Sequence, residues 1–386
     1  MELNWFAAWI YLREKLSGYQ LLGEQQAGRF DWKERSSYQR FKIPILSGGF
    51  LTLILVVWGF MAFSSESSGT VVHQVNPYVK YRLSAAWSWS NMDRLFIFGD
   101  SWSSTSFNFE LQAPSPESPI GVPGWPGETT GNGPNWVGYL TYQRNESLLL
   151  TADFAVGGGT VADLGGQDAR SVRSQITRYF PTFNANYPSF WASNSTLFFI
   201  WVGINDIHGD VDDAPTSSDA EISFPETFKV LNGLLDDIYA AGGRNLFFIN
   251  APPLARAPLV KMSYANQTEE WKQTVIDWNE NIANSAWSFA DRHNDSSVWL
   301  FDASQLLSDI MDNPCILPET CGLMRPLDYC PMFSFGRLGG IVWNSTNPEC
   351  EYSADKYFWI DPLHPTTITQ SAIAHGIYDA LKSSER

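Results

Sequence analysis

Five short apolar runs without regular polar alternation constrain the fold of this chain more than any other feature. They lie at residues 95–98, 148–156, 197–202, 245–250 and 298–301. Runs of this kind are typical of strands buried on both faces of a parallel sheet. Between them, residues 226–240 repeat apolar positions at intervals of three and four, as an amphipathic helix does. This alternation predicts a doubly wound, three-layer α/β/α domain with a five-stranded parallel sheet.

Residues 104–135 interrupt that alternation. The segment is rich in Pro and Gly and has no apolar periodicity. We therefore expect a long surface loop, of the kind that often forms the wall of an active site.

Polar or glycine residues directly follow the first three apolar runs. Ser101 comes after the first run, where its hydroxyl and N–H can face the crevice beyond the strand ends. Three glycines, 157–159, follow the second run, and glycine N–H groups can approach an anion closely. Asn205 follows the third run and can donate its side-chain N–H to a developing oxyanion. A turn or a cap explains each motif singly, so the prediction depends on all of them together.

Asp361 and His364 precede a predicted terminal helix that follows Pro365. Their spacing of three lets the carboxylate hold the imidazole tautomer while the other ring nitrogen faces Ser101. His364 is the only one of the five histidines with both a carboxylate at this spacing and a position at an element junction. The acidic stretch around His208 suggests a metal site less well than a solvated turn, so we predict no metal.

At these residues the sequence resembles the GDSL/SGNH hydrolase superfamily over residues 93–384. The resemblance implies a flavodoxin-like SGNH-hydrolase domain. It also implies a catalytic triad of Ser101, Asp361 and His364.

The same resemblance implies an oxyanion hole formed by the N–H groups of Ser101 and Gly158 and by the Asn205 side chain. Gly158 is assigned because it stands five positions after Asp153, where many members carry Asn in an N-x-A-x-x-G pattern.

Longer stretches resemble fungal acetyl esterases of the sixteenth carbohydrate-esterase family, namely IFGDSWSSTSFN, NGPNWVGYL, FAVGGGTV, FIWVGINDI, NAPPLARAP and DPLHPT. The resemblance implies a serine esterase that removes acetyl groups from carbohydrate through an acyl-enzyme, without a cofactor. An acetylated glycan of the cell's own wall is an alternative substrate. The sequence also admits a lipid acylhydrolase and a glycan-binding surface protein without catalysis, although the intact motif residues argue against the latter.

An acidic balance excludes one class of partner. The net charge is −16, and residues 1–63 hold seven basic and five acidic residues, so the acidic excess lies after residue 63. An acidic domain repels phosphate backbones, which excludes nucleic acid as a partner.

Residues 43–63 contain no charged side chain over a length sufficient to cross a bilayer. Basic residues are concentrated before this stretch, which orients the N-terminus to the cytoplasm. We expect a cytoplasmic tail at 1–42, a transmembrane signal anchor at 43–63, a linker at 64–90 and the hydrolase domain at 91–386. The protein would then be a single-pass type II membrane protein. Secretion after cleavage near residue 64 is the alternative.

Glycosylation and disulfide signals agree with a luminal or extracellular domain. N-x-S/T sequons occur at Asn145, Asn194, Asn266, Asn294 and Asn344. All four cysteines lie in one stretch, and zinc is disfavoured because no C-x-x-C spacing occurs. Of the three possible pairings we prefer neighbours, Cys315 with Cys321 and Cys330 with Cys350.

Overall fold

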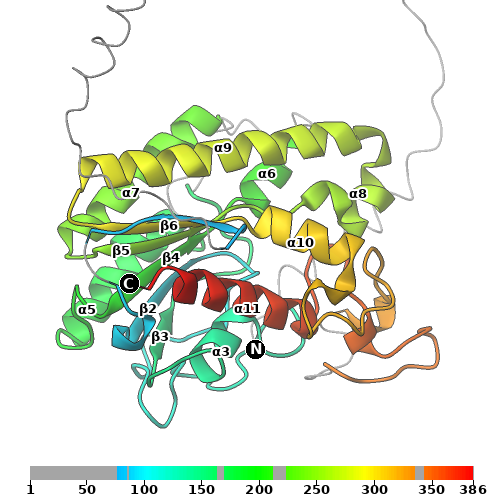
Figure 1. The fold of residues 1–386 in the computed structure, drawn as a ribbon, viewed down its shortest axis with the longest axis horizontal. Coiled ribbons are helices and arrows are strands. Elements are labelled where there is room, and N and C mark those ends of the chain that lie inside the picture. Colours follow the sequence, from blue (N-terminus) through cyan, green and yellow to red (C-terminus); the bar gives the residue numbers. More distant parts are fainter. Residues whose placement is uncertain (1–75, 85–86, 163–168, 212–222, 335–342, 386) are drawn as a thin grey trace, which may run out of the picture. The chain divides into compact units, whose positions relative to one another are not determined.

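Six strands form one sheet in the part of the chain that the structure describes (Figure 1). The computed structural model describes residues 76–385 apart from 85–86, 163–168, 212–222 and 335–342. The strands are β1 (Val79–Arg82), β2 (Arg94–Gly99), β3 (Leu150–Asp153), β4 (Thr196–Trp201), β5 (Asn245–Ile249) and β6 (Ser297–Phe301). All five predicted strands are present as β2 to β6, and they are parallel to one another.

The prediction of a purely parallel, five-stranded sheet was wrong, because β1 adds a sixth strand antiparallel to β6. Val79 and Tyr81 are buried whereas Lys80 and Arg82 are exposed, so this strand has only one face in the core. It lies at the edge of the sheet and inside the range 64–90 that the sequence assigned to a linker. The hydrolase unit therefore begins before residue 91.

The strand order is β1-β6-β5-β4-β2-β3. The five parallel strands thus have the flavodoxin-like order, in which the chain leaves β2 first toward β3 and then crosses back to β4. A crevice for ligands forms beyond the carboxyl ends of the strands at such a reversal point. Ser101 follows β2 and Asn205 follows β4, so the fold places both at this crevice.

Helices cover both faces of the sheet, with α9 across one face and α11 across the other (Figure 1). Helices α6 and α7 pack against α9, whereas α3 and α10 pack against α11. The helices are α3 (Trp136–Tyr142), α4 (Val172–Ser174), α5 (Phe180–Asn186), α6 (Ile204–Val211), α7 (Phe224–Ala240), α8 (Pro258–Ser263), α9 (Thr268–Arg292), α10 (Ala303–Asp312) and α11 (Thr367–Ser383). A π-helical turn, Gln175–Tyr179, joins α4 to α5.

The core explains why the apolar runs do not alternate. Leu95, Phe96, Ile97 and Phe98 of β2 are all completely buried, because helices cover both faces of this strand. Phe96 alone lies within 6.1 Å, centroid to centroid, of six aromatic rings. Burial of each such side chain contributes roughly 1.5–3 kcal/mol, so the strand before Ser101 is held firmly.

The segment 104–135 forms no helix or strand along its whole described length, as predicted. It is nevertheless fixed to the residues around Ser101. Thr130 Oγ1 donates to Ser101 O at 3.0 Å, and Asn135 Nδ2 donates to Ser103 O at 2.5 Å. The loop therefore forms a fixed wall of the crevice.

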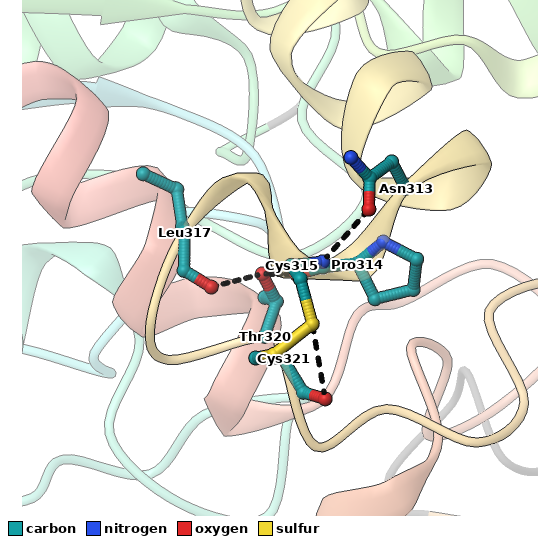
Figure 2. Close-up of a disulfide and its surroundings, with 6 residues drawn as sticks. All are labelled: Asn313, Pro314, Cys315, Leu317, Thr320 and Cys321. Atoms are coloured by element: carbon teal, nitrogen blue, oxygen red, sulfur yellow. Dashed lines mark hydrogen bonds between the residues drawn. A yellow bond between two sulfur atoms is a disulfide. The ribbon is translucent and has the colours of Figure 1, made fainter.

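Both preferred disulfides are present, Cys315–Cys321 and Cys330–Cys350, and this prediction is confirmed. Figure 2 shows the first, which closes a turn after α10. Asn313 Oδ1 accepts from Cys315 N–H at 3.3 Å, and Thr320 Oγ1 donates to Leu317 O at 3.3 Å (Figure 2). The cross-link and these bonds hold the turn together around a short 3₁₀ helix, Pro314–Ile316.

The predicted tail 1–42 and membrane anchor 43–63 lie outside the described residues. Within residues 76–385, apart from the gaps given above, no helix combines the length and the apolar character that crossing a membrane requires.

Candidate active site

A tight turn presents Ser101 at the end of β2. Asp100 organises this turn, because its carbonyl accepts from Ser103 and Ser104 N–H and its Oδ1 accepts from Trp102 N–H at 3.0 Å. Trp102 is completely buried, so its side chain anchors the turn in the core. The N–H of Ser101 has no acceptor among the described residues and is free to bind a substrate oxygen.

His364 lies between Ser101 and Asp361, the two residues with which the sequence predicts it to act. His364 Nε2 lies 2.8 Å from Ser101 Oγ, and His364 Nδ1 lies 2.8 Å from Asp361 Oδ2. Asp361 Oδ1 accepts from the N–H groups of Leu363 at 2.8 Å and His364 at 2.7 Å. Because the backbone uses Oδ1, the carboxylate is fixed with Oδ2 directed at the imidazole.

The electrostatics favour an ionised Asp361 beside His364. Burial raises the pKa of Asp361, but the charge and hydrogen bond of His364 and the two backbone N–H groups outweigh it, so this pKa lies below its usual value. Burial lowers the pKa of His364. The Asp361 charge, its hydrogen bond and the charge of Asp100 outweigh burial, so the His364 pKa is raised. An imidazole so placed accepts a proton readily.

Gly158 lies in a turn after β3, directly after Gly157, the glycine that neighbours Ser101. Its φ of +78° is in the left-handed region, and a Cβ at this position would lie 3.0 Å from Arg170 Nη1, so only glycine fits without strain. The N–H of Gly158 has no acceptor among the described residues, whereas the N–H of Gly159 donates to Val156 O at 3.0 Å. Of these two glycines, only Gly158 has a backbone N–H that is available to bind a substrate oxygen.

Asn205 lies in the first turn of α6, beside the glycine turn. Its Nδ2 donates to Gly159 O at 2.9 Å, which uses one of the two amide hydrogens and fixes the side chain. The structure thus links Asn205 to the glycine turn by a direct bond. The second hydrogen is the one an oxyanion would use.

Asp153 occupies the position where the family pattern carries Asn. Its Oδ2 accepts from Thr105 N–H at 2.7 Å and Thr105 Oγ1 at 2.8 Å, and its Oδ1 accepts from Ala155 N–H at 3.0 Å. Burial raises the pKa of Asp153 to about 7 despite these donors. The carboxyl group therefore joins the loop at 105 to the end of β3.

Two buried glutamines next to Ser101 were not predicted. Gln175 Oε1 accepts from Gly99 N–H at 2.9 Å and its Nε2 donates to Gly99 O at 2.8 Å. Gln370 Nε2 donates to Trp102 O at 3.2 Å. Gln370 shares one face of α11 with Ile373 and Ile377. A polar residue on this apolar face was the feature of the sequence that could have identified it.

The sequons are placed on the surface of the unit. Four of the five asparagines are exposed, namely Asn194, Asn266, Asn294 and Asn344. Asn145 is half-buried, and its amide donates to Thr141 O. Among the described residues, no three His, Cys, Asp or Glu side chains are arranged to hold a metal ion. Part of the acidic turn near His208 lies outside those residues.

One family model and several known proteins are similar to this chain. Residues 95–377 match the family model of the GDSL-like lipase/acylhydrolases. An acetylesterase from Thermothelomyces thermophilus is 28% identical over 75% of this chain and 88% of its own. An acetylesterase from Hypocrea jecorina is 24% identical over 72% of this chain and 86% of its own. A solved acetylxylan esterase from Geobacillus stearothermophilus superposes on 78% of this chain and 96% of its own, with 12% identity and a TM-score of 0.42.

The match to the family model covers most of the chain, and the two relatives described above are named acetylesterases. The chain therefore belongs to the GDSL-like lipase/acylhydrolase family and is a carboxylic ester hydrolase.

Proposed function

We propose that this chain is a serine esterase that hydrolyses acetyl and other short-chain esters of carbohydrate. Ser101 is the nucleophile, His364 is the general base and Asp361 orients the imidazole. The observation that carries the proposal is the pair of 2.8 Å contacts that His364 makes with Ser101 and Asp361. A nucleophile, a base and an orienting carboxylate in contact are the signature of acyl transfer.

The reaction proceeds through an acyl-enzyme. His364 Nε2 accepts the Ser101 proton as Oγ bonds to the ester carbonyl carbon, and the carbonyl electron pair moves to oxygen. The N–H groups of Ser101 and Gly158 and the Asn205 amide bind that oxyanion. Its collapse breaks the ester C–O bond, and the alcohol leaves with the proton from His364. Water then attacks the acyl group in the same way, which releases the acid and restores Ser101.

The nucleophile is tested by replacing Ser101 with Ala. We expect Ser101→Ala to lower kcat by at least roughly 10³-fold and to abolish labelling by a fluorophosphonate, which reacts only with an activated serine. Ser90→Ala is the matched control, because Ser90 is exposed and makes its side-chain contact only with Ser88. Retained turnover in purified, folded Ser101→Ala would falsify the proposal.

The acyl group is tested by a series of ester chain lengths. Both relatives described above are named acetylesterases, which supports acetyl as the acyl group here. We expect kcat/KM to fall as the acid is lengthened beyond short chains. A rise with chain length would instead identify a lipid acylhydrolase, and fluorophosphonate-resistant protein that still binds glycans would identify a non-catalytic surface protein.

We also propose that residues 43–63 anchor the esterase in a membrane, with the N-terminus cytoplasmic and the catalytic unit luminal or extracellular. The two disulfides and the four exposed sequons support this orientation. The test combines alkaline carbonate extraction with a mobility shift after peptide N-glycosidase treatment. We expect a glycosylated protein that stays in the membrane pellet. A glycosylated protein in the supernatant would indicate cleavage near residue 64, and an unshifted protein would contradict the orientation.

A further inference from the structure

A cavity of about 470 Å³ lies at the carboxyl end of β3, between the loop that follows Ser101 and the glycine turn. Gly157 forms part of its wall, and a methyl group in place of the Gly157 hydrogen would lie 3.9 Å from Ser101 Cβ. Gly157 therefore both lines the cavity and lies close to the nucleophile. An ester held at Ser101 can extend one of its two substituents into this space.

Two aromatic rings form an apolar wall of the cavity. Phe109 and Tyr179 line it, with ring centroids 5.0 Å apart and ring planes at 31°. Both side chains are half-buried, so neither ring is fully covered by protein. The Tyr179 hydroxyl donates to Ala169 O at 2.6 Å, which fixes that ring. Fixed, partly uncovered rings of this kind pack well against the C–H face of a sugar.

Polar side chains from one short loop form another part of the cavity wall. Ser106, Asn108 and Glu110 line it and are exposed. Asn108 Oδ1 accepts from Glu110 N–H at 3.0 Å, and Ser106 Oγ donates to Glu128 O at 2.8 Å, so the loop is ordered from within. Ser106 has a φ of +60°, a left-handed conformation that is uncommon for a residue other than glycine and concentrates at ligand clamps.

The charges of the lining residues restrict the occupant. Glu110 and Asp153 are acidic, and no Lys or Arg is among the described residues that line the cavity. The exposed Glu110 would repel a carboxylate or phosphate on the occupant, whereas hydroxyl groups can donate to its oxygens. The volume also far exceeds that of an acetyl group and lies in the usual range for small-molecule sites. An uncharged, hydroxyl-bearing ring satisfies both conditions.

Given the proposed esterase activity, on which this inference rests, we infer that the cavity binds the alcohol part of the ester as an uncharged pyranose. Phe109 packs against the ring and is the residue that selects sugar esters over simple ones. The acyl group then occupies the other side of the crevice. Phe109 is a specificity-determining residue that does not take part in the chemistry.

The test compares Phe109→Ala with the wild-type protein on three esters. These are methyl xyloside triacetate, which has a sugar alcohol, ethyl acetate, which has no ring, and ethyl octanoate, which has a long acyl chain. We expect Phe109→Ala to lower kcat/KM for the xyloside about 10- to 100-fold, the range for loss of one packed ring. Activity on ethyl acetate should change by less than about twofold, because no part of that substrate reaches Phe109.

Two further variants guard against misfolding and unspecific loop effects. Phe109→Leu keeps apolar bulk but removes the flat ring, so we expect the same selective loss in a protein with an unchanged Tm. Leu111→Ala is the matched control, since Leu111 is 65% exposed, lies on the same loop and does not line the cavity. It should behave as wild type on all three esters.

Each contrary result has a distinct meaning. Equal changes on the xyloside and ethyl acetate, or no change on either, would overturn the assignment of the cavity. A selective loss on ethyl octanoate would also overturn it, because the cavity would then hold the acyl chain. If the wild-type protein hydrolyses none of the three esters, the proposed esterase function itself is wrong.

Discussion

Gln175 bonds both backbone groups of Gly99, accepting from its N–H at 2.9 Å and donating to its carbonyl at 2.8 Å. The side-chain amide thus pairs with the backbone of Gly99 as a neighbouring strand would. Gly99 ends β2 and lies two residues before Ser101. Gln175 is completely buried, so neither Gly99 group can turn to water instead. The position of the nucleophile turn therefore depends on one amide from a helix 76 residues away.

We predict that Gln175→Leu lowers both stability and activity. It leaves the buried Gly99 N–H without its partner, at a cost of roughly 1–3 kcal/mol, and removes one of the two donors to Gly99 O, which keeps the N–H of Val156 at 3.2 Å. The change also loosens the turn that presents Ser101. The free energy of unfolding and the rate of fluorophosphonate labelling of folded protein measure the two effects. Gln273→Leu is the control, because Gln273 is exposed on α9 and bonds only Asp277. Unchanged labelling in a destabilised Gln175→Leu protein would mean that the glutamine supports the fold alone.

Replacing Asp361 should change the pH dependence as well as the rate. His364 must be neutral to accept the Ser101 proton, so activity is lost as pH falls through its raised pKa. Asp361→Asn removes the charge that raises this pKa and leaves burial, which lowers it. We expect kcat to fall on the order of 10³–10⁴-fold and the acid limb of the kcat/KM profile to move to lower pH.

The control for this variant removes the same charge elsewhere. Asp291 is exposed near the carboxyl end of α9, just before β6 begins and so at the opposite end of the sheet from Ser101. Asp291→Asn should leave the acid limb where it is in the wild type. An acid limb that does not move in Asp361→Asn would show that another group controls the protonation of His364.

Asp100 should destabilise the fold at high pH. Its Oδ2 is buried without a partner in the described part of the chain, and burial raises its pKa from 3.8 to about 7. Between these values the unfolded carboxyl has lost its proton while the folded one keeps it, so the free energy of unfolding falls as pH rises through this window. The full cost is present above about pH 7, as an upper figure of roughly 4 kcal/mol.

Asp100→Asn tests this cost, because Asn stays neutral and keeps the oxygen that accepts from Trp102 N–H. We expect its Tm to exceed that of wild type at pH 8 and to approach the wild-type value at pH 4. Activity should fall, since the Asp100 charge helps to raise the pKa of His364. A gain in Tm of equal size at both pH values would contradict the buried-carboxylate explanation.

The parallel strands were predictable because each is buried on both faces and reads as an uninterrupted apolar run. Strand β1 was missed although Val79 and Tyr81 alternate with Lys80 and Arg82, because four residues of alternation are a weak signal. It was assigned to a linker, where no strand was sought. Its partner β6 lies far along the chain, so local pattern alone does not reveal the pairing.

The contacts of the candidate site were predictable where they join residues close in the sequence. Asp361 and His364 lie three apart in the sequence, so their contact follows from a single turn. Gln175 was missed because its role depends on a bond to Gly99, and nothing within its own helix indicates that partner. The aromatic cavity was missed for the same reason, since Phe109 and Tyr179 meet only in the folded chain.

Replacing Asn205 distinguishes a role in binding the oxyanion from a role in holding the glycine turn. If its second amide hydrogen binds the oxyanion, Asn205→Ala should lower kcat by on the order of 10²–10³-fold with little change in KM, because the bond forms only in the transition state. Loss of the bond to Gly159 O alone would instead loosen the glycine turn, raise KM and lower Tm. Asn186→Ala is the control, since Asn186 is exposed at the end of α5. A folded Asn205→Ala protein with kcat within about threefold of wild type would leave the oxyanion to the two backbone donors.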